Sequence, residues 1–272
     1  MSKKNVTLYI NAIRNIRPDT TNITVPNISG SHGNVFIADT NDGKLVFKSN
    51  RIQMIQKNVL ASGMMKRLDI PAPDLATTKS IGRYKKQYFE VYPYVHDKTL
   101  YEHIGNGMKS EIIQKSFFEM ADILAKMSKF PVDQYNALRY THAHQITSAN
   151  ISDTTNLIMG KFYQAAVIML NIGKQYVMHF DMTPKNTVVN DRGEIQHVLD
   201  LDAVGICSEN FALAAMVSKY QQLGFNLPEI LEYYEQNVRR KIQYRTIIRQ
   251  ANLNNIGKHL HWVVGHKKQG SK

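Results

Sequence analysis

The sequence is poor in cysteine, and its 272 residues include only Cys207. One thiol can form neither an intrachain disulfide nor a cluster of thiolate metal ligands, so both are excluded as sources of stability. A chain without disulfides is typical of a reducing compartment, and we expect the protein in the cytoplasm. Cys207 itself is expected to be a small buried apolar residue rather than a nucleophile.

Long hydrophobic runs are also missing, since none reaches the ~20 apolar residues that a membrane-spanning helix needs. The basic N-terminus, Met1–Asn5, is followed by neither the apolar segment nor the small-residue cleavage site of a secretory signal. A hydrophobic content of 43% and a charged content of 21% are ordinary for a globular protein. Because 272 residues are many for a single hydrophobic core, we expect two lobes.

Acidic residues are scarce, which gives a net charge of +12 and a pI near 9.6. From residue 236 to the end there is no Asp or Glu, against nine basic residues: Arg239, Arg240, Lys241, Arg245, Arg249, Lys258, Lys267, Lys268 and Lys272. This pattern indicates either a surface for an anionic partner, such as a phosphorylated substrate, nucleic acid or an acidic membrane, or a solvated helix face with a basic tail. We prefer the tail for Lys267–Lys272 and leave both interpretations open for Arg239–Arg249. Aromatic residues do not recur there at a regular spacing, so single-stranded nucleic acid is not favoured.

The N-terminal part of the chain predicts a small β-rich lobe. Apolar residues recur at helical spacing from Val6 to Ile16, and this helix ends before Pro18. A second helix is expected over 51–68. The predicted strands are Ile23–Val25, Asn34–Ala38, Lys44–Lys48, Leu75–Thr78 and Gln87–Tyr92, with Asn41–Lys44 as the turn of a hairpin.

From residue 98 onward the pattern is mainly helical. Helices are expected over 109–129, 153–172, 208–222 and 228–250. Two short strands, Thr187–Val189 and His197–Leu199, are joined by the turn Asn190–Gly193. We therefore expect a bilobal α+β protein, with an N-lobe over 1–95, a connector near Pro93–Asp97 and a C-lobe over 96–272.

The strongest chemical signal is His179-Phe-Asp-Met-Thr-Pro-Lys-Asn186, followed by Val198-Leu-Asp-Leu-Asp202. Phosphoryl transfer to a hydroxyl needs a carboxylate that orients the hydroxyl and accepts its proton, and oxygen ligands for Mg²⁺. Asp181 suits the base, while Asn186 and Asp200 offer an amide oxygen and a carboxylate for the metal. The turn between the two strands should bring Asn186 and Asp200 to the same side.

This spaced motif resembles that of the aminoglycoside phosphotransferase and choline-kinase-like group of the protein-kinase-like superfamily. The resemblance implies a kinase-like fold in which Asp181 is the catalytic base and Asn186 and Asp200 bind Mg²⁺. It also implies that His179 braces the loop and that Asp202 is a second metal ligand or a group behind the ligands. The nucleotide would be ATP, although the sequence does not distinguish ATP from GTP.

The same resemblance assigns nucleotide contacts to the N-lobe. The loop with Gly30, Ser31 and Gly33 would cover the phosphates with backbone N–H groups, although alone it is more often a hairpin turn. Lys48 sits where the family has its phosphate-binding lysine. In the connector, the Pro93 carbonyl and the Val95 N–H would bind adenine, and the alternative is a plain linker.

One departure from the family pattern concerns the lysine. The family places a glutamate on the helix after the lysine strand, but residues 51–68 contain no Asp or Glu. Asn58 falls nearest that position, with Gln56 close by, and neither can neutralise Lys48. We therefore expect Lys48 to pair elsewhere, or the active arrangement not to depend on a salt bridge.

Other departures bear on the acceptor. Thr183 stands where conventional protein kinases have a lysine, and Ala203–Cys207 leads almost directly into a helix that begins at Ser208, which leaves no long peptide-binding segment. A small-molecule hydroxyl is therefore favoured. Because the chain is basic, a neutral or anionic acceptor is preferred to a cationic aminoglycoside, although carboxylates at Glu229, Glu232 and Glu235 could reverse that preference. The alternatives are an atypical RIO-like protein kinase and a catalytically weak pseudokinase or nucleic-acid-binding module.

Overall fold

The computed structural model describes residues 3–26, 35–75, 81–84, 87–133 and 174–252. Contacts divide the chain into two compact units. The first consists of Met1–Asp97 together with His197–Asp202, and the second of Lys98–Gln196 and Ala203–Lys272. The short segment His197–Asp202 therefore belongs with the N-terminal unit, although it lies about 100 residues further along the chain.

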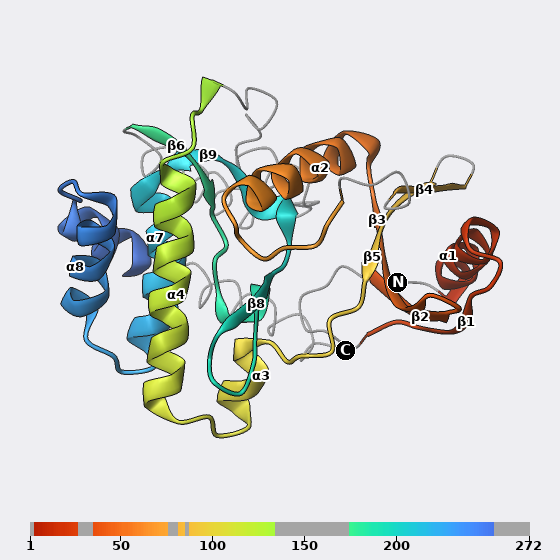
Figure 1. The fold of residues 1–272 in the computed structure, drawn as a ribbon, viewed down its shortest axis with the longest axis horizontal. Coiled ribbons are helices and arrows are strands. Elements are labelled where there is room, and N and C mark those ends of the chain that lie inside the picture. The colour runs from red at the N-terminus through yellow and green to blue at the C-terminus, as the bar shows by residue number, and fades with distance from the viewer. Residues whose placement is uncertain (1–2, 27–34, 76–80, 85–86, 134–173, 253–272) are drawn as a thin grey trace, which may run out of the picture. The chain divides into compact units, whose positions relative to one another are not determined.

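The first unit is an antiparallel sheet of five strands in the order β1-β2-β3-β5-β4, with two helices (Figure 1). Its elements are α1 (Lys3–Ile16), β1 (Thr21–Thr24), β2 (Val35–Thr40), β3 (Gly43–Asn50), α2 (Ile52–Arg67), β4 (Ile81–Tyr84) and β5 (Gln87–Pro93). The predictions for both helices and for the central strands are confirmed.

The β2–β3 hairpin forms where the sequence predicts it. Thr40 pairs with Gly43 across the turn, and the Thr40 hydroxyl donates a hydrogen bond to the Gly43 carbonyl over 2.7 Å. Gly43 has a φ of 103°, which glycine adopts without the steric cost that other residues bear. This turn sets the register that carries Lys48 to its place on β3.

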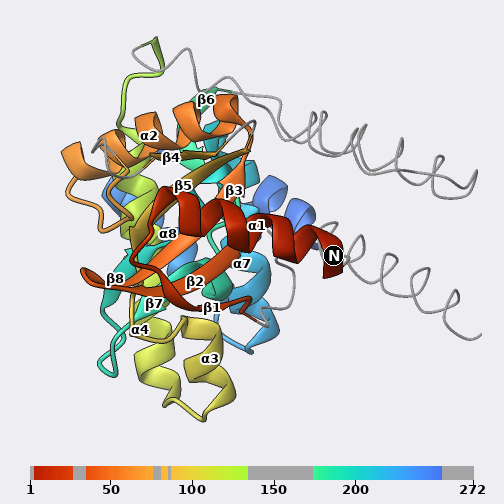
Figure 2. The same cartoon turned by 90° about the vertical axis from the view of Figure 1, so that its right-hand side faces the viewer.

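Helix α1 covers one face of this sheet, as Figure 2 shows. Ala12 and Ile13 are fully buried against a core from β2, β3 and β5 that includes Phe36, Phe47 and Phe89. At Gly82 of β4 a Cβ atom would lie 2.7 Å from the Ile16 side chain, so only glycine permits this close approach of strand and helix. Helix α1 and the sheet thus share one hydrophobic core.

The strand predicted at Leu75–Thr78 is wrong at its start. Leu75 is buried but belongs to no strand, because its N–H bonds to the Ser62 hydroxyl of α2 over 2.9 Å instead of to a ladder. Residues 76–78 lie outside the described residues. The pairing strand is β4, in register with the first half of β5.

The second unit is mainly helical, as predicted. It contains α3 (Leu100–Gly105), α4 (Ser110–Ser128), α7 (Glu209–Gln222) and α8 (Leu227–Val238), with strands β6 (Gln175–His179), β7 (Thr187–Val189), β8 (Ile195–Val198) and β9 (Val204–Ser208). Helix α4 packs against α7 and α8 (Figure 1), where Phe117 stacks edge-on against Tyr220 and Phe118 against Tyr233. The helix predicted over 153–172 lies outside the described residues.

Two small antiparallel sheets frame the predicted motif. Strand β6 pairs with β9, and β7 pairs with β8 through the predicted turn. Gly193 in that turn has a φ of 76°, and a Cβ there would lie 2.7 Å from the Ile112 carbonyl, so both backbone and space require glycine. The chain passes into the first unit within β8. The β6–β9 pair was not anticipated from the sequence.

The single helix predicted over 228–250 is wrong, since α8 ends at Val238 and a new helix begins at Tyr244. Arg239 adopts a left-handed φ of 54°. After it, Arg240 turns inward to an ion pair with Glu209, and its guanidinium lies 4.5 Å from the ring centre of Tyr176. Lys241 pairs with Glu235 at 2.7 Å. Helix α8 ends at the left-handed Arg239, and the ion pairs of Arg240 and Lys241 occupy part of the basic segment.

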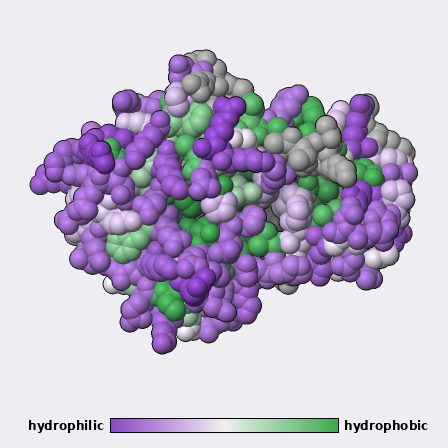
Figure 3. Space-filling view, viewed as in Figure 1, coloured by the Kyte–Doolittle hydropathy of each residue, from purple (hydrophilic) through white to green (hydrophobic). Residues whose placement is uncertain are grey.

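Cys207 is buried in β9, and burial raises the pKa of its thiol to about 12, so it is an inert apolar residue as predicted. Among the helices that the structure describes, none is long and apolar enough to cross a membrane. Hydrophilic residues predominate on the face seen in Figure 3.

Candidate active site

The catalytic loop predicted from the motif follows β6 in the second unit. The backbone N–H of Phe180 donates to the Ala203 carbonyl over 2.9 Å, which ties the start of the loop to the residue before β9. His179 is fully buried, and its Nδ1 accepts a hydrogen bond of 3.3 Å from the Asp181 N–H. This hydrogen bond supports the bracing role predicted for His179. A short 3₁₀ turn at Pro184–Asn186 then leads into β7.

Asp181 and Asn186 are brought together by this loop. The Asn186 side-chain nitrogen donates to the Asp181 carboxylate over 2.8 Å and to the Asp181 carbonyl over 2.9 Å. Since the nitrogen of Asn186 is the atom turned to Asp181, its oxygen, the atom able to bind Mg²⁺, is directed elsewhere. Asp181, the candidate base, and Asn186, a candidate metal ligand, are thus joined by two hydrogen bonds.

The other predicted group lies in the first unit around Lys48. Its Nζ is 2.9 Å from the carboxylate of Asp200 and 2.9 Å from that of Asp202. Burial alone would lower the pKa of Lys48, but the negative charges of Asp200, Asp202 and Glu90 outweigh it and raise that pKa well above its usual value. Lys48 therefore pairs with residues outside α2, which is the first of the two alternatives that the absence of a helix carboxylate left open.

Asp200 and Asp202 differ in their surroundings. The Asp200 side chain is 41% exposed, and its backbone adopts a left-handed φ of 56°, a conformation that aspartate tolerates better than most residues and that is common at functional sites. Asp202 is enclosed: the Asn50 amide donates to its two oxygens at 3.1 and 3.3 Å, and the Asn58 amide also donates to it. The oxygens of Asp202 are largely occupied by protein donors.

Two charged residues of this group were missed from the sequence. Glu90 on β5 pairs in register with Lys48 on β3 and is only 2% exposed, and Lys57 of α2 donates to the Asp202 carbonyl over 2.6 Å. Burial lowers the pKa of Lys57 to about 8. In the sequence Glu90 stood out only as the one carboxylate within the apolar run Tyr88–Tyr92. Its pairing with Lys48 joins β3 to β5, two strands that α2 and β4 separate in sequence.

Burial raises the pKa of Glu90 to about 7, and the positive charge of Lys48 and the hydrogen bonds from Asn58 at 2.6 Å and Asn50 at 3.4 Å only partly offset this. Because the folded-state pKa lies above that of the unfolded chain, protonated Glu90 contributes stability that is complete below about pH 4.5 and is lost as the pH rises through 7. We expect the free energy of unfolding to fall across that window by up to about 3 kcal/mol, at about 1.4 kcal/mol per pKa unit. Urea unfolding of Glu90→Gln should show a flatter pH dependence than wild type, and equal slopes would contradict the assignment.

The predicted nucleotide contacts are described in part. Gly30, Ser31 and Gly33 lie outside the described residues. Pro93 ends β5, and the next N–H, that of Tyr94, donates to the Lys44 carbonyl of β3 over 2.9 Å. Because successive backbone groups of an extended chain point to opposite sides, the Pro93 carbonyl and the Val95 N–H should face away from β3. In the described residues β4 pairs with β5 only up to Glu90, so no described strand covers that edge.

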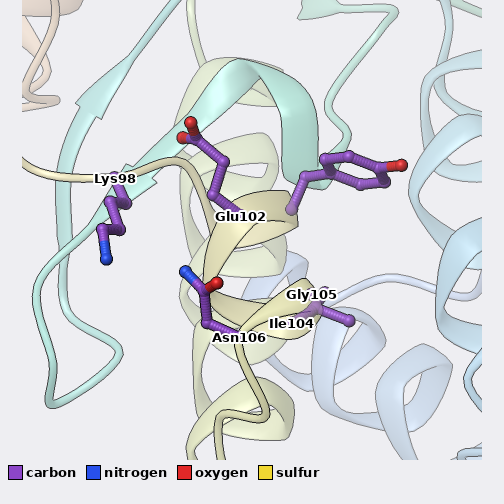
Figure 4. A pocket seen from close by; sticks show the side chains of 6 residues that line it. Lys98, Glu102, Ile104, Gly105 and Asn106 are labelled. Atoms are coloured by element: carbon purple, nitrogen blue, oxygen red, sulfur yellow. The ribbon is translucent and has the colours of Figure 1, made fainter.

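A pocket of about 570 Å³ lies beside α3 in the second unit (Figure 4). It is lined by Lys98, Tyr101, Glu102, Ile104, Gly105 and Asn106. Glu102 is engaged in capping α3, since its carboxylate accepts from the Thr99 N–H over 2.8 Å. The Nζ of Lys185, the residue before Asn186, lies 5.0 Å from the Tyr101 ring centre. The pocket thus adjoins the catalytic loop.

Sequence comparison finds no matching family model and no similar curated protein. Structure comparison does find similar proteins. The GDP complex of wild-type aminoglycoside 2'-phosphotransferase-IIIa has a TM-score of 0.63 at 12% identity, over 98% of this chain and 94% of that one. The aminoglycoside phosphotransferase APH(3'')-Id from Streptomyces rimosus, with ADP and streptomycin, has a TM-score of 0.60 at 11% identity, over 91% and 98%. The choline kinase LicA from Streptococcus pneumoniae has a TM-score of 0.55 at 15% identity, over 100% and 93%.

The chain has a kinase-like fold. This confirms the fold predicted from the motif, including its mixed character, with strands concentrated in the N-terminal part and helices in the C-terminal part. Within the kinase-like fold, α2 is the helix on which the resemblance would place the missing glutamate, and Asn58 occupies its buried face while Gln56 is exposed.

The predicted Mg²⁺ ligands are distributed over both units, with Asn186 in one and Asp200 and Asp202 in the other. Carboxylate and amide oxygens are the donors that Mg²⁺ prefers, so Asp200 and Asn186 fit the ion chemically. Among the described residues no group of three or more His, Cys, Asp or Glu side chains is arranged to hold a metal by itself. The joint metal site therefore stays a prediction.

Proposed function

We propose that this protein transfers the γ-phosphoryl group of Mg·ATP to a hydroxyl of a small molecule. The observation that carries the proposal is the contact of Lys48 with Asp200, two residues 152 positions apart in sequence. Each was assigned to phosphate or metal binding from its own motif, and the 2.9 Å contact supports both assignments together. The similar structures, which include complexes with GDP and ADP, support nucleotide binding.

In the proposed reaction the acceptor oxygen forms a bond to the γ-phosphorus as the bond to the β–γ bridging oxygen breaks, and ADP leaves with that electron pair. The proton of the acceptor hydroxyl passes to the Asp181 carboxylate, which Asn186 orients through its 2.8 Å hydrogen bond. Lys48 binds the phosphates. Mg²⁺, held by Asp200 and Asn186, would neutralise the charge of the phosphates.

The acceptor is proposed to be neutral or anionic. Two lysines, Lys98 and Lys185, are associated with the pocket beside α3, and its one carboxylate, Glu102, is already used as a helix cap. Of the three carboxylates that could attract a cationic acceptor, Glu235 is paired with Lys241 and Glu229 accepts from the Gln114 amide over 2.9 Å. The local charges thus support the preference drawn from the net charge of +12.

A combined thermal-shift and ATP-consumption screen tests the proposal. The acceptors should include a neutral sugar, a sugar phosphate, a nucleoside and kanamycin, with Mg·ATP and with Mg·GTP. We expect Mg·ATP to raise the melting temperature and one neutral or anionic acceptor to stimulate ATP consumption, both the stimulation and the product being lost in Asp181→Asn.

Three other outcomes would redirect the assignment. Neither a thermal shift nor ATP consumption would contradict a phosphotransferase. Strong phosphorylation of the protein itself without an acceptor would favour an atypical protein kinase. Binding of generic RNA or DNA with a steep salt dependence, in the absence of nucleotide effects, would favour a nucleic-acid-binding module.

A further inference from the structure

The side chain that replaces the missing helix glutamate can be identified from the contacts around Lys48. Asp202 receives Lys48 on its Oδ2 at 2.9 Å, and its Oδ1 receives the amides of Asn58 and Asn50. Helix α2 thus contributes a neutral side chain that contacts the carboxylate, not the lysine.

Asn58 is suited to this position by the number of its donors. An amide nitrogen carries two N–H groups, and here it bonds two carboxylates, Glu90 at 2.6 Å and Asp202. Asn58 is fully buried, so water cannot take over either contact. A carboxylate in its place would offer no donor to either of these acceptors, and its added negative charge would be costly in a buried site.

The Asp202 backbone is held as well. The Lys57 ammonium donates to its carbonyl over 2.6 Å, from the residue that precedes Asn58 on α2. The Asn50 amide, at the end of β3, reaches both Asp202 and Glu90. Donors from α2 and β3 therefore contact Asp202 on several sides. The amides of Asn50 and Asn58 also donate to Glu90 of β5, which helps to hold them in place.

We propose that Asp202 is the carboxylate that fixes Lys48 for phosphate binding, and that Asn58 and Glu90 are positioning residues that hold Asp202 in place. The inference rests on the proposed function. It assigns Asp200, the more exposed carboxylate, to the metal, and gives Asp202 the task that the family gives to a helix glutamate.

The test is a double-mutant cycle on Asn58 and Asp202, read as the KM for Mg·ATP in acceptor-free ATP hydrolysis and as the dissociation constant of Mg·ADP by calorimetry. Asn58→Asp and Asp202→Asn should each weaken nucleotide binding by about tenfold or more, the range expected for a hydrogen bond to a charged group. In the double variant an amide and a carboxylate again face each other. Its fold-loss in nucleotide affinity should therefore be at least about tenfold smaller than the product of the fold-losses of the two single variants. If the double variant loses as much affinity as the product of the two single fold-losses, the two residues act independently and the inference is overturned.

Two controls separate positioning from folding. Gln56→Glu adds the same charge to the exposed face of α2 and should leave the KM unchanged. Asn58→Gln keeps the amide and should recover most of the affinity lost in Asn58→Asp, with the KM for Mg·ATP moving more than kcat. If Asn58→Asp is folded by circular dichroism and binds Mg·ADP as wild type does, the inference fails alone. If wild type binds neither Mg·ATP nor Mg·ADP, the proposed function fails and the inference with it.

Discussion

Replacement of Asp181 by asparagine is expected to lower kcat for phosphoryl transfer by about 10²- to 10⁴-fold, the range for loss of a general base. Asparagine retains an oxygen that can accept the hydrogen bond from Asn186, so the loop should keep its shape. The KM for Mg·ATP should change little, because the side chain acts on the acceptor hydroxyl.

The measurement is a steady-state assay with the acceptor found in the screen, together with calorimetric binding of Mg·ADP. Unchanged Mg·ADP affinity would show that the variant is folded and that its nucleotide site is intact. A loss of kcat smaller than about tenfold would mean that Asp181 is not the base.

Replacement of Lys48 by methionine is the second change with a large expected effect. It removes the cation between Asp200 and Asp202 and close to the buried Glu90, and leaves the like charges with the more distant compensation of Lys57, which contacts the Asp202 carbonyl. Removing one partner of a buried pair is strongly destabilising, and because Asp200 is partly exposed we expect a loss of about 2–4 kcal/mol in the free energy of unfolding. Affinity for Mg·ATP should fall as well.

The effect of Lys48→Met should grow with pH, because Glu90, with a pKa near 7, is protonated at pH 6 and ionised at pH 8. Denaturant unfolding at these two pH values measures it. Lys44→Met is the matched control on the same strand: Lys44 is 40% exposed and 3.9 Å from Asp39, so its loss should cost within about 1 kcal/mol. Equal losses in the two variants would contradict a central role for Lys48.

Much of the fold could be predicted because local chemistry determined it. The Asp42-Gly43 pair specified the hairpin, the spacing from Val6 to Ile16 specified α1, and Ser208 capped α7 by accepting from the Phe211 N–H. The loop from His179 to Asn186 could be recognised because its chemistry depends on residues close together in sequence.

Other features depended on contacts that no local pattern shows. The break after Val238 arises because Arg240 finds Glu209, more than 30 positions away, so helical periodicity alone could not reveal it. Leu75 has the apolar neighbours of a strand, but Ser62 takes its N–H. Glu90 lies in the strand predicted at Gln87–Tyr92, but its partnership with Asn58 emerges only when β5 lies beside β3 and α2 packs against β5.

The anchoring of α2 has a consequence for control of activity. If the helix moved away from the sheet, both Asn58 bonds and the Lys57 bond would break. Asn50 of β3 would still donate to both carboxylates, but each hydrogen bond lost to a charged group would cost about 1.5–3 kcal/mol. A helix that serves as an on–off switch needs an alternative set of partners of similar energy. Helix α2 is tied by neutral and charged donors at adjacent positions, so it is poorly suited to such a switch. Lys48 of β3 should therefore be held in place by Asp202 whether or not nucleotide is bound.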